Sequence, residues 1–283
     1  MMDDRPGQRY ADEYLNRHRM TTEAAARRPP ETSYAAQFMG QPSDDVRTTE
    51  HVPPRSPLRA LASPLALPGS LMRRLTHNER ELANVEGNLF STGQPIRCLW
   101  FTSASNGEGK SMAALNAAYG LAAMAARRVL LVDANPSAPS VARQFNTVDT
   151  PGLREVLSGE TAVETALHST PCQGLEVMTV GVGWDRFGGI LPAEAMQDFL
   201  ATVQVHYDFV ILDGSSIYGN SDAQRIGSLC DGAILVAACE RTKIEVLQNA
   251  ATHLGHVGVM VLGVTLNRRR FYIPDALYGW LAR

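Results

Sequence analysis

Residues 104–111 read Ala-Ser-Asn-Gly-Glu-Gly-Lys-Ser, between the apolar run Cys98–Phe101 and a helical pattern of small residues over Ser111–Ala126. The stretch follows the phosphate-binding pattern G-x-x-x-x-G-K-[ST], with alanine at the first glycine. Glycines in such a loop let backbone N–H groups surround an anion, and the lysine brings positive charge to the β- and γ-phosphates. The serine offers a hydroxyl to Mg²⁺ at the start of a helix, where an anion is favoured. The stretch therefore predicts nucleotide binding.

This loop defines most of the candidate site. The loop and the first helical residues after it are expected to contact the nucleotide: Ser105, Asn106, Gly107, Glu108, Gly109, Lys110, Ser111 and Met112. Lys110 is also a candidate catalytic residue, because no other cation in the loop can take its place. The alternative is a glycine-rich turn with a chance Gly-Lys-Ser. The flanking strand and helix disfavour it, because the phosphate-binding motif requires both.

Composition narrows the class of protein. With 283 residues, 45% of them hydrophobic, the chain can bury the core of one large domain or two small ones. A net charge of −3 gives no electrostatic argument for a nucleic-acid partner. The four cysteines have no C-x-x-C spacing, which favours a reducing, cytoplasmic environment. No apolar run is long enough to span a membrane, so we expect membrane association only through a partner.

The first seventy residues contain nine of the sixteen prolines and no sustained apolar period. Such a segment cannot bury enough surface to offset its ordering entropy, so residues 1–70 are predicted to form a disordered extension. Apolar residues in Leu58–Leu75 are interrupted by prolines and glycine, which suggests a docking arm rather than a core element. The folded domain, residues 71–283, is predicted to begin with a capping box at Thr76–Glu79, followed by a helix to Leu89.

From residue 97 onward, apolar runs alternate with helical patterns. The predicted strands are Arg97–Ser103, Arg128–Asp133, Leu175–Val180, Phe209–Asp213, Gly232–Ala238 and Val257–Leu266. The predicted helices are Ser111–Ala126, Leu153–Ser158, Thr161–His168, Ala193–His206, Ala223–Leu229 and Thr242–Leu254. The last helix is expected to have one apolar face, made of Ile244, Leu247, Ala251 and Leu254. The pattern predicts an α/β fold, a doubly wound and mostly parallel sheet covered on both faces.

Two predicted strands end in aspartate, Asp133 after Val129–Val132 and Asp213 after Phe209–Leu212. Ligands of parallel α/β sheets lie at the carboxyl ends of strands, so both carboxylates are expected near the loop. Phosphoryl transfer needs carboxylates that hold Mg²⁺ and that align or deprotonate the attacking group. A single aspartate there more often only begins a turn, but two beside a phosphate loop favour function. Asp133 and Asp213 are therefore candidate catalytic residues.

The order of three motifs resembles the bacterial tyrosine kinases of exopolysaccharide and capsule synthesis. They are Ser-Ala-Ser-Asn-Gly-Glu-Gly-Lys-Ser, Val-Leu-Leu-Val-Asp-Ala-Asn ending at Asn135, and Phe-Val-Ile-Leu-Asp ending at Asp213. Further matching stretches are Pro151–Gly159 and Gly263–Arg268, so the resemblance covers roughly residues 76–270. The resemblance rests on the order of the motifs as well as on the sequence of each motif.

The resemblance has implications for ligands and partners. It implies ATP, with Mg²⁺ held by Ser111, Asp133 and Asp213, and contact with the adenine by Asn267 together with Arg268. It also implies a cytoplasmic ATPase or protein-tyrosine kinase that reaches the membrane through an activating partner. That partner is a chain-length-determinant protein, also called a polysaccharide co-polymerase. A homo-oligomer is compatible with the resemblance.

Four positions depart from the family pattern. Asn135 replaces the second acidic residue and cannot act as a base. Asp213-Gly-Ser-Ser replaces Asp-x-Pro-Pro, and Glu81–Gly87 matches poorly the glutamate and two arginines that build the kinase ring. Only two tyrosines, Tyr272 and Tyr278, occur in Arg268–Arg283. The pattern therefore favours ATP binding over tyrosine phosphorylation.

Two alternatives from other classes remain open. The first is a nucleotide-dependent scaffold of the same polysaccharide machinery with little catalytic activity, which Asn135 and the weak ring motif favour. The second is an ATPase of the partition or division-site type. Those proteins use an additional lysine five residues before the loop lysine, and Ser105 at that position counts against them.

Overall fold

The computed structural model describes residues 58, 60, 65–76, 96–123, 125–184, 192–218 and 223–268, which all belong to one compact unit, Pro53–Arg283. The strands in these ranges are β1 (Cys98–Thr102), β2 (Val129–Ala134), β3 (Leu167–Ser169), β4 (Leu175–Met178), β5 (Phe209–Gly214), β6 (Gly232–Ala238) and β7 (Val261–Asn267). They form one sheet in the order β3-β4-β2-β5-β1-β6-β7. Within it only the β3–β4 pair is antiparallel, so the predicted mostly parallel α/β fold is confirmed.

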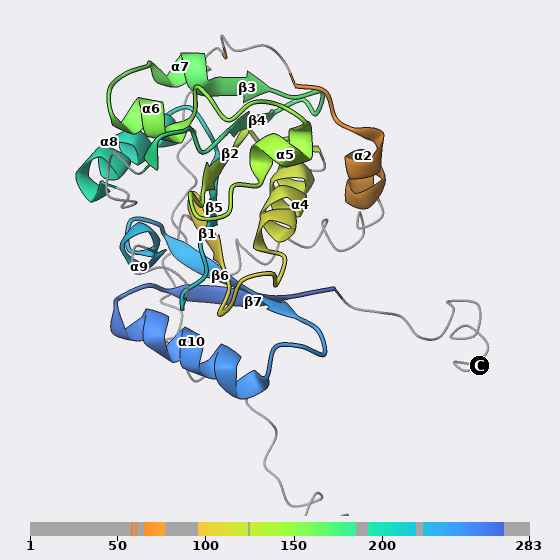
Figure 1. Cartoon of the computed structure of the whole chain (residues 1–283), viewed down its shortest axis with the longest axis vertical. Helices are drawn as coiled ribbons and strands as arrows, with labels where there is room; N and C mark the ends of the chain where they lie inside the picture. The colour runs from red at the N-terminus through yellow and green to blue at the C-terminus, as the bar shows by residue number, and fades with distance from the viewer. Residues whose placement is uncertain are drawn as a thin grey trace, which may run out of the picture. The chain divides into compact units, whose positions relative to one another are not determined.

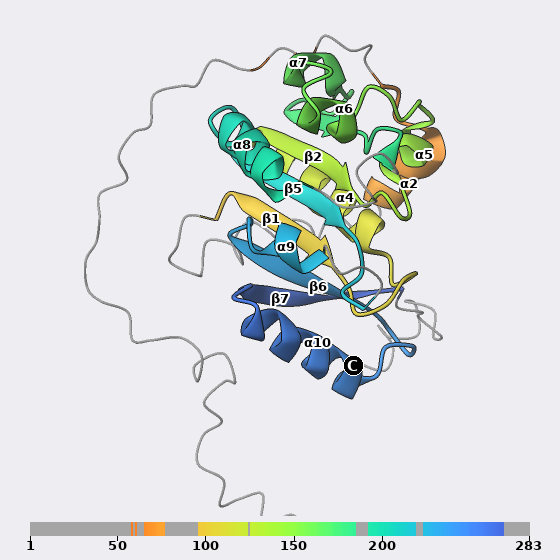
Figure 2. The ribbon, with the colours of Figure 1, turned by 60° about the vertical axis from the view of Figure 1, so that its left-hand side comes forward.

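Helices cover both faces of this sheet (Figures 1 and 2). The described helices are α2 (Gly69–Thr76), α4 (Lys110–Ala123), α5 (Val141–Phe145), α6 (Leu153–Leu157), α7 (Val163–Ala166), α8 (Ala193–Gln204), α9 (Ala223–Gly227) and α10 (Ile244–His256). Figure 1 shows α2, α4 and α5 on the right of the sheet and α8 and α9 on the left. Because crossover helices lie on each side, the strands between them are removed from water on both faces.

The central strands β1, β2 and β5 are buried along their whole length. Alternate residues of each strand point to opposite faces. Leu99, Leu131 and Ile211 therefore pack in one hydrophobic cluster with α2 and α4. Trp100 and Leu130 pack in the other cluster, together with residues of α8, α9 and α10. The uninterrupted apolar runs of the sequence correspond to this two-sided burial.

The predicted helix Thr161–His168 is wrong at its C-terminal end, at Leu167 and His168. The helix α7 ends at Ala166, and Leu167–Ser169 forms β3, which pairs antiparallel with β4. Leu167 is fully buried and lies opposite Met178 in this pair. Pairing with an exposed sheet edge outweighs the helical spacing, because tertiary packing overrides the small differences in helix propensity.

The last strand and helix also differ from the prediction. The strand predicted from Val257 begins only at Val261, because α10 continues to His256 and a turn with Gly258 at φ +78° follows. On α10, Ala250 and Leu254 are buried, whereas Ile244, expected on the apolar face, is 65% exposed. Ile244 is the first residue of the helix, and the buried residues of α10 lie in its later turns.

The docking-arm interpretation of Leu58–Leu75 is wrong for the second half of that segment. Residues 69–76 form α2, and Leu71 and Leu75 are fully buried in the α4-side cluster. The segment also donates a backbone hydrogen bond from Leu65 N to Ser169 O at 2.9 Å. Two leucines one helical turn apart give α2 an apolar face, which the nearby prolines obscured.

Several expectations lie outside the described residues. These are nearly all of the disordered extension, the helix after Thr76, the ring motif Glu81–Gly87, and the tyrosines Tyr272 and Tyr278. They remain predictions of the sequence.

Candidate functional site

The phosphate-type loop connects the carboxyl end of β1 to the first residue of α4, as the sequence predicts. Gly107 and Gly109 have φ of +80° and +95°, a backbone conformation that favours glycine. Ala104 is fully buried and does not have a positive φ, so alanine is accommodated where the standard pattern has glycine. The loop can therefore keep its conformation with one glycine fewer.

Exposure divides the loop into a rim and a floor. Ser105, Asn106 and Gly107 are exposed, whereas Glu108 and Lys110 are only 6% exposed. Burial lowers the pKa of the Lys110 ammonium, although the charges of Asp213 and Glu108 act in the opposite direction. A buried cation at the start of a helix attracts an anion strongly, because little water screens it.

The two strand-end carboxylates lie side by side. β2 and β5 are neighbours, and Asp133 pairs in register with Asp213; both side chains are fully buried. Burial, followed by the charge of Asp213, raises the pKa of Asp133 to about 7. Burial also raises the pKa of Asp213 to about 6, although Ser111, Ser140 and Lys110 stabilise its ionised form. Removal of a carboxylate from water and a like charge nearby both disfavour the ionised form, and at Asp133 both causes act.

Asp133 is held by backbone N–H groups. Its Oδ2 accepts hydrogen bonds from Ser140 N at 2.7 Å and Val141 N at 2.9 Å, at the start of α5. Its Oδ1 accepts one from Asn135 N at 3.1 Å. The helix α5 was not predicted from the sequence, and its N-terminal amides fix the position of the Asp133 carboxylate.

Asp213 is held less completely. Its Oδ2 accepts a hydrogen bond from the Ser140 hydroxyl at 2.9 Å, and the Ser111 hydroxyl also interacts with the carboxylate. Its Oδ1 is buried and has no hydrogen-bond partner. An unsatisfied buried carboxylate oxygen costs free energy unless a donor or a cation meets it. Asp213 lies at the carboxyl end of β5, and the positive charge of Lys110 lowers the pKa of this carboxylate.

Two departures from the family pattern contact each other in the structure. The Ser215 hydroxyl donates to Asn135 Oδ1 at 2.8 Å, and both side chains are buried. The Ser216 hydroxyl donates to Asn106 Oδ1 on the loop at 2.9 Å. Serines after β5 therefore replace the expected prolines with hydrogen bonds, one to the asparagine that replaces the acid and one to the loop.

The predicted Asn267 and Arg268 lie at the end of β7, next to the loop. Asn267 Nδ2 donates to Glu108 O at 3.1 Å and to Gly109 O at 3.2 Å, so its amide rests on the loop. Arg268 is exposed, with φ +59°, and its N–H donates to Asn267 Oδ1 at 2.8 Å. The structure thus brings both residues to the site, with the Asn267 amide directed at the backbone of the loop.

Three residues of the site were missed as site residues by sequence reasoning: Ser140, Ser216 and Thr242. Ser140 is 73 residues from the carboxylate it contacts, and Thr242 is 134 residues from Glu108. Single polar residues in loops give no periodic signal. Position after the carboxyl end of a strand was the only available indication, and it applied to Ser216 after β5 and to Thr242 after β6.

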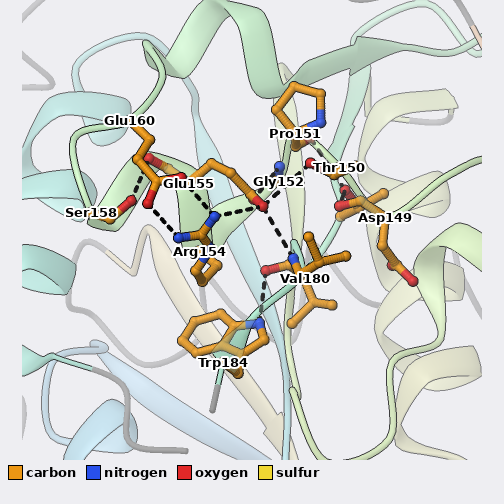
Figure 3. A network of polar contacts seen from close by, with 12 residues as sticks. Asp149, Thr150, Pro151, Gly152, Arg154, Glu155, Ser158, Glu160, Val180 and Trp184 are labelled. Atoms are coloured by element: carbon orange, nitrogen blue, oxygen red, sulfur yellow. Dashed lines mark hydrogen bonds and ion pairs between the residues drawn. The ribbon is translucent and has the colours of Figure 1, made fainter. Parts of the chain in front are cut away.

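A second buried polar network lies on α6 (Figure 3). Arg154 pairs with Glu160 through Nη1 at 2.6 Å and with Glu155 through Nη2 at 3.1 Å. Glu155 Oε2 accepts from Gly152 N at 2.9 Å and Oε1 from Val182 N at 3.2 Å. Burial alone would raise the pKa of Glu155, but these donors and Arg154 lower it below its ordinary value. The network joins the Pro151–Gly159 stretch to the segment after β4.

The fold and the loop together define a P-loop protein of the nucleotide-binding α/β class. The chain is 31% identical over 180 residues to the tyrosine-protein kinase YwqD of Bacillus subtilis, which covers 64% of this chain and 76% of the relative. It is 29% identical over 182 residues to the tyrosine-protein kinase CpsD of Streptococcus pneumoniae, covering 64% and 80%. The chain belongs to the bacterial tyrosine-protein kinase family, and the predicted resemblance is confirmed.

Solved structures agree with this assignment. The kinase domain of VpsO aligns with a TM-score of 0.61 at 26% identity, over 71% of this chain and 98% of that one. The septum site-determining protein MinD of Pyrococcus horikoshii, solved with Mg-ADP, aligns with a TM-score of 0.53 at 22% identity, over 64% and 75%. The latter similarity concerns the fold alone. No family model matches the chain, and no helix among the described residues is both long and apolar enough to cross a membrane.

Proposed function

We propose that the chain binds ATP and Mg²⁺ at the loop and transfers the γ-phosphoryl group to tyrosine, as part of exopolysaccharide or capsule synthesis. The observation that carries this proposal is the buried Asp213 Oδ1 without a partner, on a carboxylate that interacts with Ser111 and Lys110. Family membership supports the reaction, and the positive-φ glycines of the loop support binding of a phosphate chain.

The residues present fit a magnesium ion. Oxygen donors are what Mg²⁺ prefers, and it is commonly bound by one or two carboxylates together with phosphate oxygens. In the proposed site Ser111 and Asp213 hold it, with Asp133 beside them. When bound, Mg²⁺ would neutralise charge on the phosphates and relieve the repulsion between the two buried carboxylates.

The chain's own residues have distinct proposed tasks. Lys110 places its charge at the β- and γ-phosphates, and the N-terminus of α4 adds its dipole. Asp133, with a pKa of about 7, is suited to accept a proton from the attacking hydroxyl, since a base works best near the operating pH. Its three backbone donors keep the carboxylate in place for this step.

The proposed cellular setting follows from the family. We propose a cytoplasmic domain that reaches the membrane through a chain-length-determinant protein, with residues from about 71 onward forming the nucleotide-binding part and residues 1–70 an extension. Formation of a homo-oligomer fits the same setting. Because Leu65 is buried, a truncation that preserves the domain should end before that residue, and the compact unit begins at Pro53.

The experiment is an ATP-dependent anti-phosphotyrosine assay on the purified chain, alone and with the cytoplasmic segment of its membrane partner. We expect phosphotyrosine to form with MgATP and the partner, and Lys110→Ala to abolish it, because no other cation occupies the loop. An equal signal from Lys110→Ala would contradict the proposal. As a control, Arg225→Met on the exposed side of α9 should retain the wild-type signal.

A second candidate function is favoured by the Asn135–Ser215 contact. Asn135 cannot titrate, and its amide oxygen is already satisfied by the Ser215 hydroxyl. The chain would then be a nucleotide-dependent scaffold of the same machinery. That function predicts MgATP binding without any phosphotyrosine or ATP hydrolysis, even with the membrane partner present.

A further inference from the structure

Glu108 lies in the loop, yet its carboxylate is committed to other parts of the protein. Its Oε2 accepts a hydrogen bond from Ser105 N at 2.8 Å, and its Oε1 accepts one from the Thr242 hydroxyl. The residue is only 6% exposed. Both carboxylate oxygens therefore have partners inside the molecule, and the side chain acts on the loop itself.

Thr242 connects Glu108 to the end of β6. Its hydroxyl donates to Glu108 and at the same time accepts from Ala238 N at 2.9 Å. Accepting from one group and donating to another fixes the direction of the hydroxyl proton. Between Ala238 and Thr242 the chain turns through Glu240, which has φ +63°. The turn that places Thr242 therefore contains a residue in the left-handed backbone conformation.

Asn267 forms a second connection, from the end of β7. Its Nδ2 donates to both Glu108 O and Gly109 O, while its Oδ1 accepts from Arg268 N. A Cβ built on Gly109 would lie 1.8 Å from Asn267 Nδ2, so the amide occupies the space that only glycine leaves free. The ends of β6 and β7 are joined in turn, since Cys239 N donates to Asn267 O at 2.8 Å.

We propose that Thr242 is a positioning residue for nucleotide binding, which holds the loop in its anion-binding conformation through Glu108. Thr242, Glu108 and Asn267 form what we call the loop anchor. The anchor ties the loop to strands on the side of the sheet away from Asp133, while Ser216 ties it through Asn106 to the end of β5. This inference rests on the proposed function, since it assigns a role in binding the same nucleotide.

The physical reason is preorganisation. Backbone N–H groups bind a phosphate well only if they already point inward, because ordering them on binding would consume affinity. The Glu108 carboxylate accepts hydrogen bonds from the Ser105 amide and from the Thr242 hydroxyl. Loss of the Thr242 hydrogen bond leaves Glu108 Oε1 without this donor, so residues 105–108 can move. A hydrogen bond to a charged group is among the stronger ones, and its loss corresponds to about tenfold in affinity.

The test compares Thr242→Val, which keeps shape but lacks the hydroxyl, with Thr242→Ser, which retains it. We expect MgADP affinity to fall about tenfold in Thr242→Val and to stay within about twofold of wild type in Thr242→Ser. In the nucleotide-free chain, amide hydrogen exchange should become faster over Ser105–Gly109 in the valine variant only. Thr202→Val is the matched control, because the Thr202 hydroxyl bonds its own helix α8 at Asp198 O.

The outcomes separate this inference from the proposed function. If Thr242→Val binds MgADP as wild type does, or if Thr242→Ser is as weak as Thr242→Val, the inference is overturned while nucleotide binding stands. If the wild type binds no MgADP, the proposed function fails, and unchanged exchange over Ser105–Gly109 would overturn the anchor as well. Should Thr242→Val not fold, Glu108→Gln replaces it, with the same losses expected because the acceptor charge is removed.

Discussion

Two clusters of buried charged groups in this molecule differ in how far opposite charge compensates their carboxylates. On α6, Arg154 lies between Glu155 and Glu160 with distances of 3.1 and 2.6 Å (Figure 3). At the ends of β2 and β5, two carboxylates face each other, and one Asp213 oxygen has no partner. In the first cluster the protein itself pairs the carboxylates with Arg154. In the second, Lys110 offsets the charge of Asp213 only in part, and we propose that a bound cation supplies the rest.

The pKa directions express the same difference. Donors and Arg154 lower the pKa of Glu155, so its ionised form stabilises the fold at neutral pH, and this stability is lost as pH falls through the lowered pKa. The pKa of Asp133 is raised, so the folded chain binds more protons than the unfolded chain, and stability falls as pH rises from about 4 towards about 7. The α6 cluster and the carboxylate pair that is proposed to bind a ligand therefore respond to pH in opposite directions.

The largest effect is expected for Arg154→Met. Removing the guanidinium leaves Glu155 buried without an opposite charge, which should cost about 3 kcal/mol in the free energy of unfolding. Urea unfolding monitored by circular dichroism measures it. As a control, Arg225→Met removes an exposed arginine and should change the free energy by less than about 0.5 kcal/mol. Equal values for the two variants would show that the α6 cluster does not stabilise the fold.

The next effect concerns the ligand. With free MgADP about a hundredfold above its dissociation constant, the wild type should gain about 2.7 kcal/mol in stability. Lys110→Ala should lose most of this gain, because the buried ammonium is the positive charge of the loop. Thermal unfolding with and without MgADP measures it. An undiminished shift in Lys110→Ala would rule out this loop as the nucleotide site, whereas Arg225→Met should keep the whole shift.

A smaller effect is the acid response of Glu155. The neutral variant Glu155→Gln should be less stable than wild type at about pH 7, and the gap should narrow as pH falls below about 4.5. The reason is that protonation at low pH removes the negative charge of Glu155 from the wild type, and the substitution has already removed that charge from the variant. Unfolding free energies along this pH range measure the gap, with Glu194→Gln on the exposed side of α8 as control. A gap that does not change with pH would mean that Glu155 acts by shape and not by charge.

Much of the candidate site could be predicted because many of its functional residues are close together in the sequence. The loop lies between one strand and one helix, and its glycines and Lys110 are contiguous in sequence. Asp133 and Asp213 were predictable because each ends an apolar run. Their adjacency in register was not, since the order of strands in a sheet is set by packing and not by any single segment.

What the sequence did not predict depends on contacts between distant segments. Helix α5 has only five residues, and its role as donor to Asp133 arises from where the chain returns after β2. The strand β3 forms because β4 offers it an edge. Thr242 gave no signal beyond its place after β6, because the role of its hydroxyl depends on the contact with the distant Glu108.

The smallest expected change in the nucleotide-free chain belongs to Asp213→Asn, and it tests the central claim, that the carboxylate pair awaits a cation. Removing one of two buried like charges should leave the free energy of unfolding unchanged or raise it by up to roughly 1 kcal/mol at about pH 7.5. The Oδ1 of asparagine can accept the hydrogen bond from the Ser140 hydroxyl, and its NH₂ group then replaces the carboxylate oxygen that has no partner.

The decisive measurement is the thermal unfolding of wild type and Asp213→Asn, each without ligand and with saturating MgADP. We predict that the variant is at least as stable as wild type without ligand, and that MgADP no longer raises its unfolding temperature as it does for wild type. A variant that is several kcal/mol less stable without ligand, yet stabilised by MgADP as much as wild type, would contradict the account.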